Sequence, residues 1–179
     1  ETREQESQRK IADLGSRLNT ALAQKVQELT RYRSDFFGRL RAILGERADM
    51  RVVGDRFVLQ SELLFPVGQA TLLPEATPEI DRIAGALKEL EMNIPPDIAW
   101  IIRVDGHTDV RPISTPQFPN NWSLSAARAI AVVEAFIARG ISPQHLVAAG
   151  FGEFQPIDTG DTQEAYARNR RIEFKLTER

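Results

Sequence analysis

The sequence contains no cysteine among its 179 residues and only two histidines. Without cysteine, disulfide scaffolds, thiolate zinc sites and cysteine nucleophiles are all excluded. The net charge is −2 and the sequence pI is near 5.8, so the chain lacks the basic excess typical of a dedicated nucleic-acid-binding protein. We therefore expect no nucleic-acid partner and no cofactor.

Long apolar runs are also missing. No stretch approaches the ~18 consecutive apolar residues of a membrane-spanning helix, and the best candidate, 126–138, is interrupted by Arg128 and Glu134. No signal peptide is recognisable, and the chain opens on Glu1. We expect the sequence to be a piece of a longer protein, with any membrane anchor upstream of Glu1.

Proline and glycine are scarce in the first part of the chain. All ten prolines lie at or after Pro66, which predicts a helical arm over residues 1–48 followed by a loop-containing domain over 51–179. We expect Gly45 and Asp49 to close the arm. Apart from a gap at Tyr32, apolar residues recur along the arm in steps of three or four, as one helical stripe. Its members are Ile11, Leu14, Leu18, Leu22, Val26, Leu29, Phe36, Leu40 and Ile43.

An apolar stripe of this length must be buried against something. Two arrangements stay open: a parallel coiled-coil dimer, or a helix that folds back on its own domain. The spacing fits about 3.6 to 3.7 residues per turn, which argues against a long left-handed supercoil. A dimer formed through the arm is our preferred interpretation.

From Arg51 onward the pattern predicts an α/β fold of the α+β sandwich kind, with one mixed sheet packed by helices. We expect a strand or short hairpin over 51–62, and a helix with Thr77 as N-cap that ends before Pro95. A buried strand over 98–104 and a helix capped by Ser123 that ends at Gly140 follow. The remaining elements are a strand over 145–150, a short polar helix over 161–169 and a final strand over 171–176.

Polar residues follow the predicted buried strand directly, in the motif Gly106-His107-Thr108-Asp109. Side chains at strand ends can face a ligand while the backbone stays rigid. A metal site would use His107 with Asp105 or Asp109, but two histidines without a ligand spacing are a weak metal signal. We expect no metal here.

The next motif, Asn121 to Ala129, begins a helix and contains Arg128. Free backbone N–H groups in a first helical turn and an arginine fork both favour a carboxylate. If Asp109 lies nearby, the pair suits a zwitterionic amino-acid head. The alternative, that Asp109 and Arg128 merely pair with each other, stays open on charge alone.

A basic run, Ala167 to Glu173, precedes the last predicted strand, and such runs are usually solvated faces or helix contacts. The sequence has no phosphate-binding glycine loop and no nucleophile elbow. We therefore expect no catalytic activity.

Four ordered motifs together resemble the C-terminal domain of the OmpA/MotB/Pal family, and most closely its MotB type. They are VDGHTD (104–109), NWSLSAARA (121–129), GFGEFQPI (150–157) and NRRIEF (169–174). The stretch 65–76 also resembles the family, although Pro66 replaces its usual aspartate. The loop 110–120 is longer than in the shortest members.

The resemblance implies noncovalent binding of the peptide stem of peptidoglycan, including its diaminopimelate. On this basis Asp109 and Arg128 hold the amino-acid end of that residue. Secondary candidates are Thr108, Asn121, Leu124 through its backbone, Asn169 and Arg170.

The expected role is a periplasmic wall anchor attached to the inner membrane, as a homodimer with a MotA-like channel partner. One alternative is an outer-membrane or lipoprotein-type wall tether. A third, of another class, is a hydrolase of wall peptides that uses His107 and Asp109.

Overall fold

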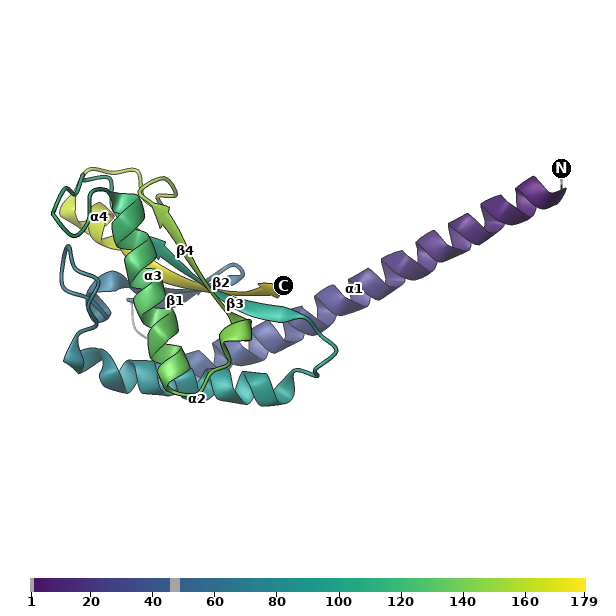
Figure 1. Ribbon diagram of the computed structural model, residues 1–179, viewed down its shortest axis with the longest axis horizontal. Helices are drawn as coiled ribbons and strands as arrows, with labels where there is room; N and C mark the ends of the chain where they lie inside the picture. Colours follow the sequence, from purple (N-terminus) through teal and green to yellow (C-terminus); the bar gives the residue numbers. More distant parts are fainter. Residues whose placement is uncertain (1, 46–48) are drawn as a thin grey trace.

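The computed structural model describes residues 2–45 and 49–179 (Figure 1). Its longest element is helix α1, Thr2–Leu44, as the arm pattern predicts. The helix ends at Gly45, which has a φ of +79° and donates its N–H to the carbonyl of Arg41 at 3.0 Å. A left-handed glycine is a common helix terminator, so the predicted stop at Gly45 is confirmed.

The two halves of α1 have different surroundings. The C-terminal half packs on the domain and buries Leu29, Phe36, Phe37, Leu40 and Leu44. Residues 2–28 are all exposed and project away from the body (Figure 1). The fold-back arrangement therefore applies to the C-terminal half of the stripe, which packs on the domain. The N-terminal half is exposed in the single chain, and the dimer prediction concerns this half alone.

In the projecting half, the apolar stripe is fully presented to solvent. Ile11, Leu14 and Leu18 are 69%, 64% and 61% exposed, and Leu22 and Val26 are exposed as well. Within residues 2–45 and 49–179, no helix combines the length and apolar character required to cross a bilayer. The stripe is thus a surface feature of a polar helix.

One mixed sheet lies at the centre of the domain. Its strands follow the order β1-β2-β5-β3-β4, in which β3 and β4 are parallel and the other neighbours antiparallel. Residues 51–62 form the hairpin anticipated there. The strands are β1 (Met50–Val53), β2 (Arg56–Gln60), β3 (Trp100–His107), β4 (Leu146–Gly152) and β5 (Arg171–Glu178).

Helices α1, α2 (Thr77–Asn93) and α3 (Asn121–Ala138) supply one continuous core with the sheet. Alternate residues of the central strands, such as Val104 and Phe174, point into this core. The residues between them belong to the opposite face, because side chains alternate along a strand. Helix α4 (Gln163–Asn169) precedes β5, and single-turn helices span Ser61–Leu63, Pro74–Ala76 and Pro143–His145.

Two predicted helix caps are wrong. The N-cap of α2 is Ala76, because the single turn Pro74–Ala76 leads directly into the helix and places Thr77 inside it. The N-cap of α3 is Asn120, whose side chain accepts the N–H of Ser123 at 2.9 Å. Ser123 therefore lies within the first turn, and its hydroxyl also donates to Asn120.

The third strand differs from its predicted bounds. It begins at Trp100 and runs through His107, so Asp105 and His107 lie within the strand and only Thr108 and Asp109 follow it. The cause is the pairing with β5, which continues to the register pair His107 and Arg171. The apolar run ends at Val104, but hydrogen bonding to β5 continues the strand as far as His107.

Two glycines let α3 approach the sheet closely. A Cβ at Gly106 would lie 2.2 Å from the carbonyl oxygen of Ser125, and one at Gly150 would lie 2.7 Å from the backbone nitrogen of Ala126. Real Cβ atoms do not come so near to backbone. Glycine at these positions therefore allows α3, which carries Arg128, to pack close to the parallel strands β3 and β4.

We expect Gly106→Ala to lower the free energy of unfolding by about 1 to 3 kcal/mol or more, because backbone must move to admit the methyl group. The matched control is Gly85→Ala on α2, where nothing lies within 4 Å of the added Cβ. That change should be neutral or stabilise by up to about 1 kcal/mol. Urea denaturation measures both. Equal unfolding free energies for the two variants would refute the close-approach argument.

Candidate functional site

One cavity, of about 550 Å³, collects the predicted site residues. It lies where the end of β3 meets the start of α3, beside the segment 67–69 and the loop after Asp109. Every predicted site residue except Asn169 lines it: Thr108, Asp109, Asn121, Leu124, Arg128 and Arg170. The volume is within the usual range for small-molecule pockets.

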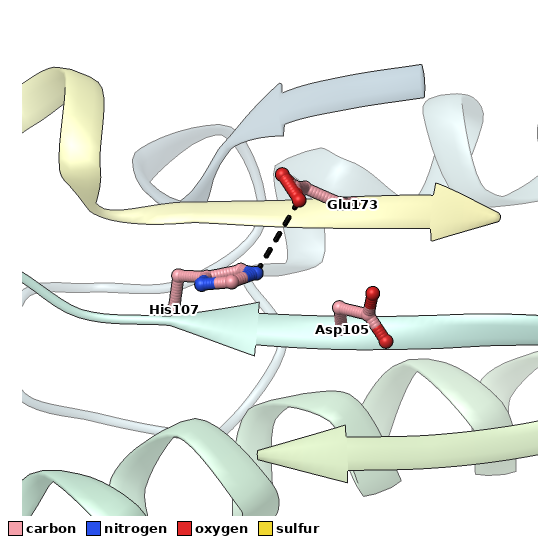
Figure 2. A group of neighbouring side chains, drawn as sticks. All are labelled: Asp105, His107 and Glu173. Atoms are coloured by element: carbon pink, nitrogen blue, oxygen red, sulfur yellow. Dashed lines mark ion pairs between the residues drawn. The ribbon is translucent and has the colours of Figure 1, made fainter. Parts of the chain in front are cut away.

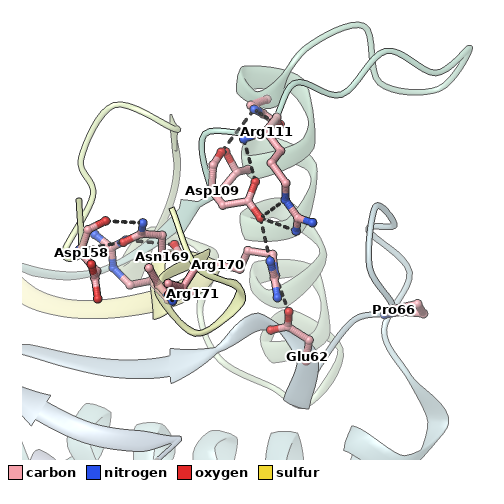
Figure 3. A network of polar contacts seen from close by, with 12 residues as sticks. Glu62, Pro66, Asp109, Arg111, Asp158, Asn169, Arg170 and Arg171 are labelled. Carbon is pink, nitrogen blue, oxygen red and sulfur yellow. Dashed lines mark hydrogen bonds and ion pairs between the residues drawn. The ribbon is translucent and has the colours of Figure 1, made fainter. Parts of the chain in front are cut away.

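Asp109 and Arg128 do not pair with each other through a salt bridge. Asp109 instead binds two other arginines (Figure 3): its Oδ2 accepts Arg111 Nη2 at 2.7 Å and Arg170 Nη1 at 2.7 Å. The Oδ1 atom accepts the backbone N–H of Arg111 at 2.9 Å. The open alternative from the sequence, a simple Asp109–Arg128 pair, is therefore wrong.

The surroundings of Asp109 keep its carboxylate charged. Burial raises its pKa, but the hydrogen bonds from Arg111 and Arg170 outweigh burial and leave the pKa below its ordinary value. The Asp109 side chain is 7% exposed and lines the cavity. It is a fixed negative group at neutral pH.

Arg128 is held by backbone carbonyls and not by a carboxylate. Its Nε donates to the carbonyl of Gln69 at 2.8 Å and its Nη2 to that of Pro66 at 3.1 Å. Burial lowers its pKa to about 10, which leaves the guanidinium charged at neutral pH. Its buried Nη1 has no hydrogen-bond partner in the described chain. An unpaired donor on a buried cation is costly, and an anionic ligand group would satisfy it.

The start of α3 offers fewer free N–H groups than the sequence suggests. The N–H of Ser123 and that of Leu124 both bond to Asn120, through its side chain and its carbonyl respectively. Asn121 points its amide at the carbonyl of Arg111, at 3.0 Å. Anion binding therefore depends on Arg128 more than on the helix start.

Asn169 has a different task from the one predicted. Its Oδ1 accepts the N–H groups of Ile157 and Asp158, and its Nδ2 donates to the carbonyl of Asp158 at 2.7 Å (Figure 3). The side chain is almost fully buried and is not part of the cavity wall. Asn169 fixes the loop before α4, whereas its neighbour Arg170 reaches Asp109 and Glu62.

Sequence reasoning missed three sets of groups that hold the charged residues of the cavity in place. Arg111 follows Asp109 by two residues, a spacing that could have signalled the contact. Glu62, which binds Arg170, comes from a segment 108 residues away in sequence and has no local signal. The carbonyls that hold Arg128 are also invisible in a sequence, because any residue supplies a carbonyl.

A second charged cluster lies outside the cavity, on the sheet face opposite the core (Figure 2). Asp105, His107 and Glu173 place ligand-type atoms within 4.8 Å of one another. Each carboxylate already has an arginine: Arg103 Nε binds Asp105 at 2.7 Å, and Arg171 Nε binds Glu173 at 3.1 Å. His107 Nε2 lies 3.4 Å from Glu173.

These arginines oppose a bound cation. Glu173 also binds Arg56 at 3.1 Å, so the guanidinium charges exceed the carboxylate charges in this cluster. His107 is 2% exposed, and its ring stacks on that of Phe151 with 4.8 Å between the ring centroids. We interpret the cluster as a buried ion-pair network that stabilises the sheet, and Asp109 has no part in it.

Glu173 gives this network a predictable pH dependence. Burial raises the pKa of Glu173, but contact with His107 and the charge of Arg171 outweigh burial and lower the pKa to about 2. Because this folded-state pKa lies below that of an unfolded glutamate, the stabilisation is present above pH ~4.5 and is lost as pH falls toward ~2. We expect wild type to lose about 2 kcal/mol from this group between neutral pH and about pH 3.

The Glu173→Gln variant should not show that loss, and denaturant unfolding at the two pH values measures it. Burial raises the pKa of Asp105, and the charge of Glu173 raises it further, so the difference between the two proteins measures Glu173 together with its effect on Asp105. The control is Glu134→Gln on the exposed side of α3. A Glu173→Gln protein with the same acid sensitivity as wild type would contradict the assignment.

Comparison with known proteins defines the class. The family model of the OmpA family matches residues 64–170. The chain therefore belongs to the OmpA family, as its motifs indicate.

Individual relatives show the same similarity. It is 37% identical over 138 residues to the uncharacterized protein YtxE of Bacillus subtilis, covering 76% of this chain and 53% of the relative. It is 32% identical over 111 residues to the peptidoglycan-associated lipoprotein of Pseudomonas aeruginosa, covering 62% and 59%. The chain thus spans about half the length of these relatives.

Solved structures agree on the fold. A putative MotB-like protein from Desulfovibrio vulgaris has a TM-score of 0.70 and 30% identity, over 88% of this chain and 98% of that one. The cell wall anchor of the T6SS from Pseudomonas aeruginosa has a TM-score of 0.65 and 31% identity, over 80% and 97%. The mixed α/β architecture predicted from the sequence is therefore confirmed.

Proposed function

We propose that this protein binds the peptide stem of peptidoglycan without chemical change and anchors a larger assembly to the cell wall. The observation that carries the proposal is that one cavity is lined by two opposite charges that do not pair with each other. Asp109 and Arg128 both line it, and Arg128 has an unpaired donor. An amino-acid end with an ammonium and a carboxylate is complementary to this pattern.

The names of the relatives support the same function. One is a peptidoglycan-associated lipoprotein, and one solved structure is a cell wall anchor. The four motifs that resemble the OmpA/MotB/Pal family include the residues of the cavity. Thr108, Asn121 and Arg170 are secondary ligand residues in this proposal. Leu124 lines the cavity, but its backbone N–H is already bonded to the carbonyl of Asn120.

We further propose a MotB-like setting: a periplasmic domain, tethered to the inner membrane by a segment upstream, that holds a motor or transport complex with a MotA-like partner. Likeness to the MotB-like structure and the long projecting arm favour this setting. In it, 1–48 is the arm and 51–179 the wall-binding domain, although Leu40 of the arm is part of the domain's core. The second candidate, a lipoprotein-type tether, is favoured by the lipoprotein relative.

The hydrolase hypothesis has little support. It requires His107 beside Asp109, but His107 lies in the ion-pair network with Glu173, and only Asp109 lines the cavity. A general base must be within hydrogen-bond reach of the substrate, directly or through one water. We therefore propose a binding protein and not an enzyme.

Cosedimentation with purified sacculi tests the proposal. The protein should pellet with sacculi, and a soluble stem peptide that contains diaminopimelate should release it. No soluble wall fragments should appear during incubation. Failure to pellet, or release of fragments, would each overturn the proposal.

A further inference from the structure

The acceptor capacity of Asp109 is almost filled within the protein itself. Its Oδ2 accepts three N–H groups: Arg111 Nε at 3.1 Å, Arg111 Nη2 at 2.7 Å and Arg170 Nη1 at 2.7 Å. Its Oδ1 accepts the N–H of Arg111. A carboxylate offers about two acceptor positions on each oxygen, so Oδ2 is fully occupied and a ligand ammonium finds one vacant position, on Oδ1.

The two arginines on Asp109 are not equally free to leave. The Arg170 side chain is 14% exposed and is fixed on its other side by Glu62. The Arg111 side chain is 44% exposed, so it loses little packing if it moves. Its guanidinium carbon already lies 5.0 Å from the ring centre of Tyr166, which offers a second resting place through a cation–π contact.

The backbone around Arg111 is fixed, so only its side chain needs to move. The N–H of Arg111 donates to Asp109 at 2.9 Å, and its carbonyl accepts Asn121 Nδ2 at 3.0 Å. Withdrawal of the guanidinium would expose Oδ2 toward the cavity that Asp109 and Arg111 both line.

We infer that Arg111 is an internal competitor of the ligand: its guanidinium occupies the place of the ligand's ammonium and leaves Asp109 when ligand binds. This inference rests on the proposed function. A ligand centre with a free ammonium replaces the displaced positive charge, whereas an N-acylated centre does not. Arg111 therefore reduces the affinity for every ligand whose ammonium needs Asp109. It leaves unchanged the affinity for an N-acylated ligand, which has no ammonium to displace the guanidinium.

The test compares two soluble peptides by isothermal titration calorimetry: a stem tripeptide with the free amine of diaminopimelate, and the same tripeptide N-acetylated there. We expect Arg111→Gln to bind the free-amine peptide about two- to fivefold more tightly than wild type, because a half-exposed ion pair no longer competes. Affinity for the acetylated peptide should not rise.

Two further variants separate displacement from a general charge effect. Arg111→Lys keeps the charge but loses the two-pronged contact, so it should show a smaller gain in the same direction. Arg82→Gln, on the exposed face of α2, removes the same charge elsewhere and should change nothing. Thermal unfolding checks that the variants fold.

Weaker or equal binding of the free-amine peptide by Arg111→Gln would overturn the inference while leaving the proposed function intact. If wild type binds neither sacculi nor the tripeptide, the proposed function fails instead. The two failures are therefore distinguishable within one set of titrations.

Discussion

Replacing Arg128 with lysine is expected to weaken binding to the stem peptide about 10- to 100-fold. The substitution keeps a positive charge but cannot bond both the carbonyls of Pro66 and Gln69 and a ligand carboxylate with the geometry of a guanidinium. A lost charge-assisted hydrogen bond costs about 1.5 to 3 kcal/mol, and each 1.4 kcal/mol is a factor of ten in affinity. Calorimetry with the soluble tripeptide measures the change directly.

The control for Arg128→Lys is the residue that follows the last turn of the same helix. Arg139 binds Asp81 and the carbonyl of Ala135 at the far end of α3, outside the cavity. Arg139→Lys should leave the affinity unchanged. Asp109→Asn provides an independent test of the opposite charge with nearly constant shape. Wild-type retention on sacculi by both Arg128→Lys and Asp109→Asn would show that this cavity is not the wall-binding site.

The sequence predicted the helices and strands that have a strong hydrophobic periodicity. It also predicted the two charged residues of the candidate site, Asp109 and Arg128. Helix α2 forms where the sequence predicts a helix and buries Ile80, Ile83 and Leu87 on one side, because tertiary packing and helical period agree there. Asp109 and Arg128 come to one cavity because a buried strand ends just before the first and a helix that packs on that strand carries the second.

What the sequence could not reveal depends on contacts between distant segments. The partners of Asp109 required knowledge of where Arg170 would lie, 61 residues further on. The alternation of charged residues along β3 and β5 could indicate a solvated face, yet Asp105 and Glu173 are buried as register partners on paired strands. Each is held by the arginine two residues before it on its own strand. Asn169 matched a family motif, but its amide serves the neighbouring loop.

We propose that the arm strengthens wall binding beyond what the cavity alone provides. Two binding sites joined in one dimer can raise avidity on a polymer by ~10² to 10⁴ without any new contact. The projecting half of α1 presents an exposed apolar stripe that a second copy of the chain would bury. A single cavity with few charge-assisted contacts binds only modestly, so the dimer that we propose would account for firm anchoring.

We expect the triple variant Leu14→Gln, Leu18→Gln and Leu22→Gln to be monomeric and to lose ~10² to 10⁴ in apparent affinity for sacculi. Glutamine has nearly the helix propensity of leucine, so the arm itself should remain helical. Its affinity for the soluble tripeptide should equal that of wild type, because the cavity lies in a different part of the molecule. Sedimentation equilibrium and sacculus binding measure the two properties.

The control places the same residue type on the other side of the arm, as Ser16→Gln and Thr20→Gln, which lie about half a turn from the stripe. These changes should leave both the oligomeric state and sacculus binding as in wild type. If the wild-type protein sediments as a monomer, the proposal that the arm forms a dimer is wrong. A triple variant that becomes monomeric yet keeps full sacculus binding would show instead that a single cavity suffices for anchoring.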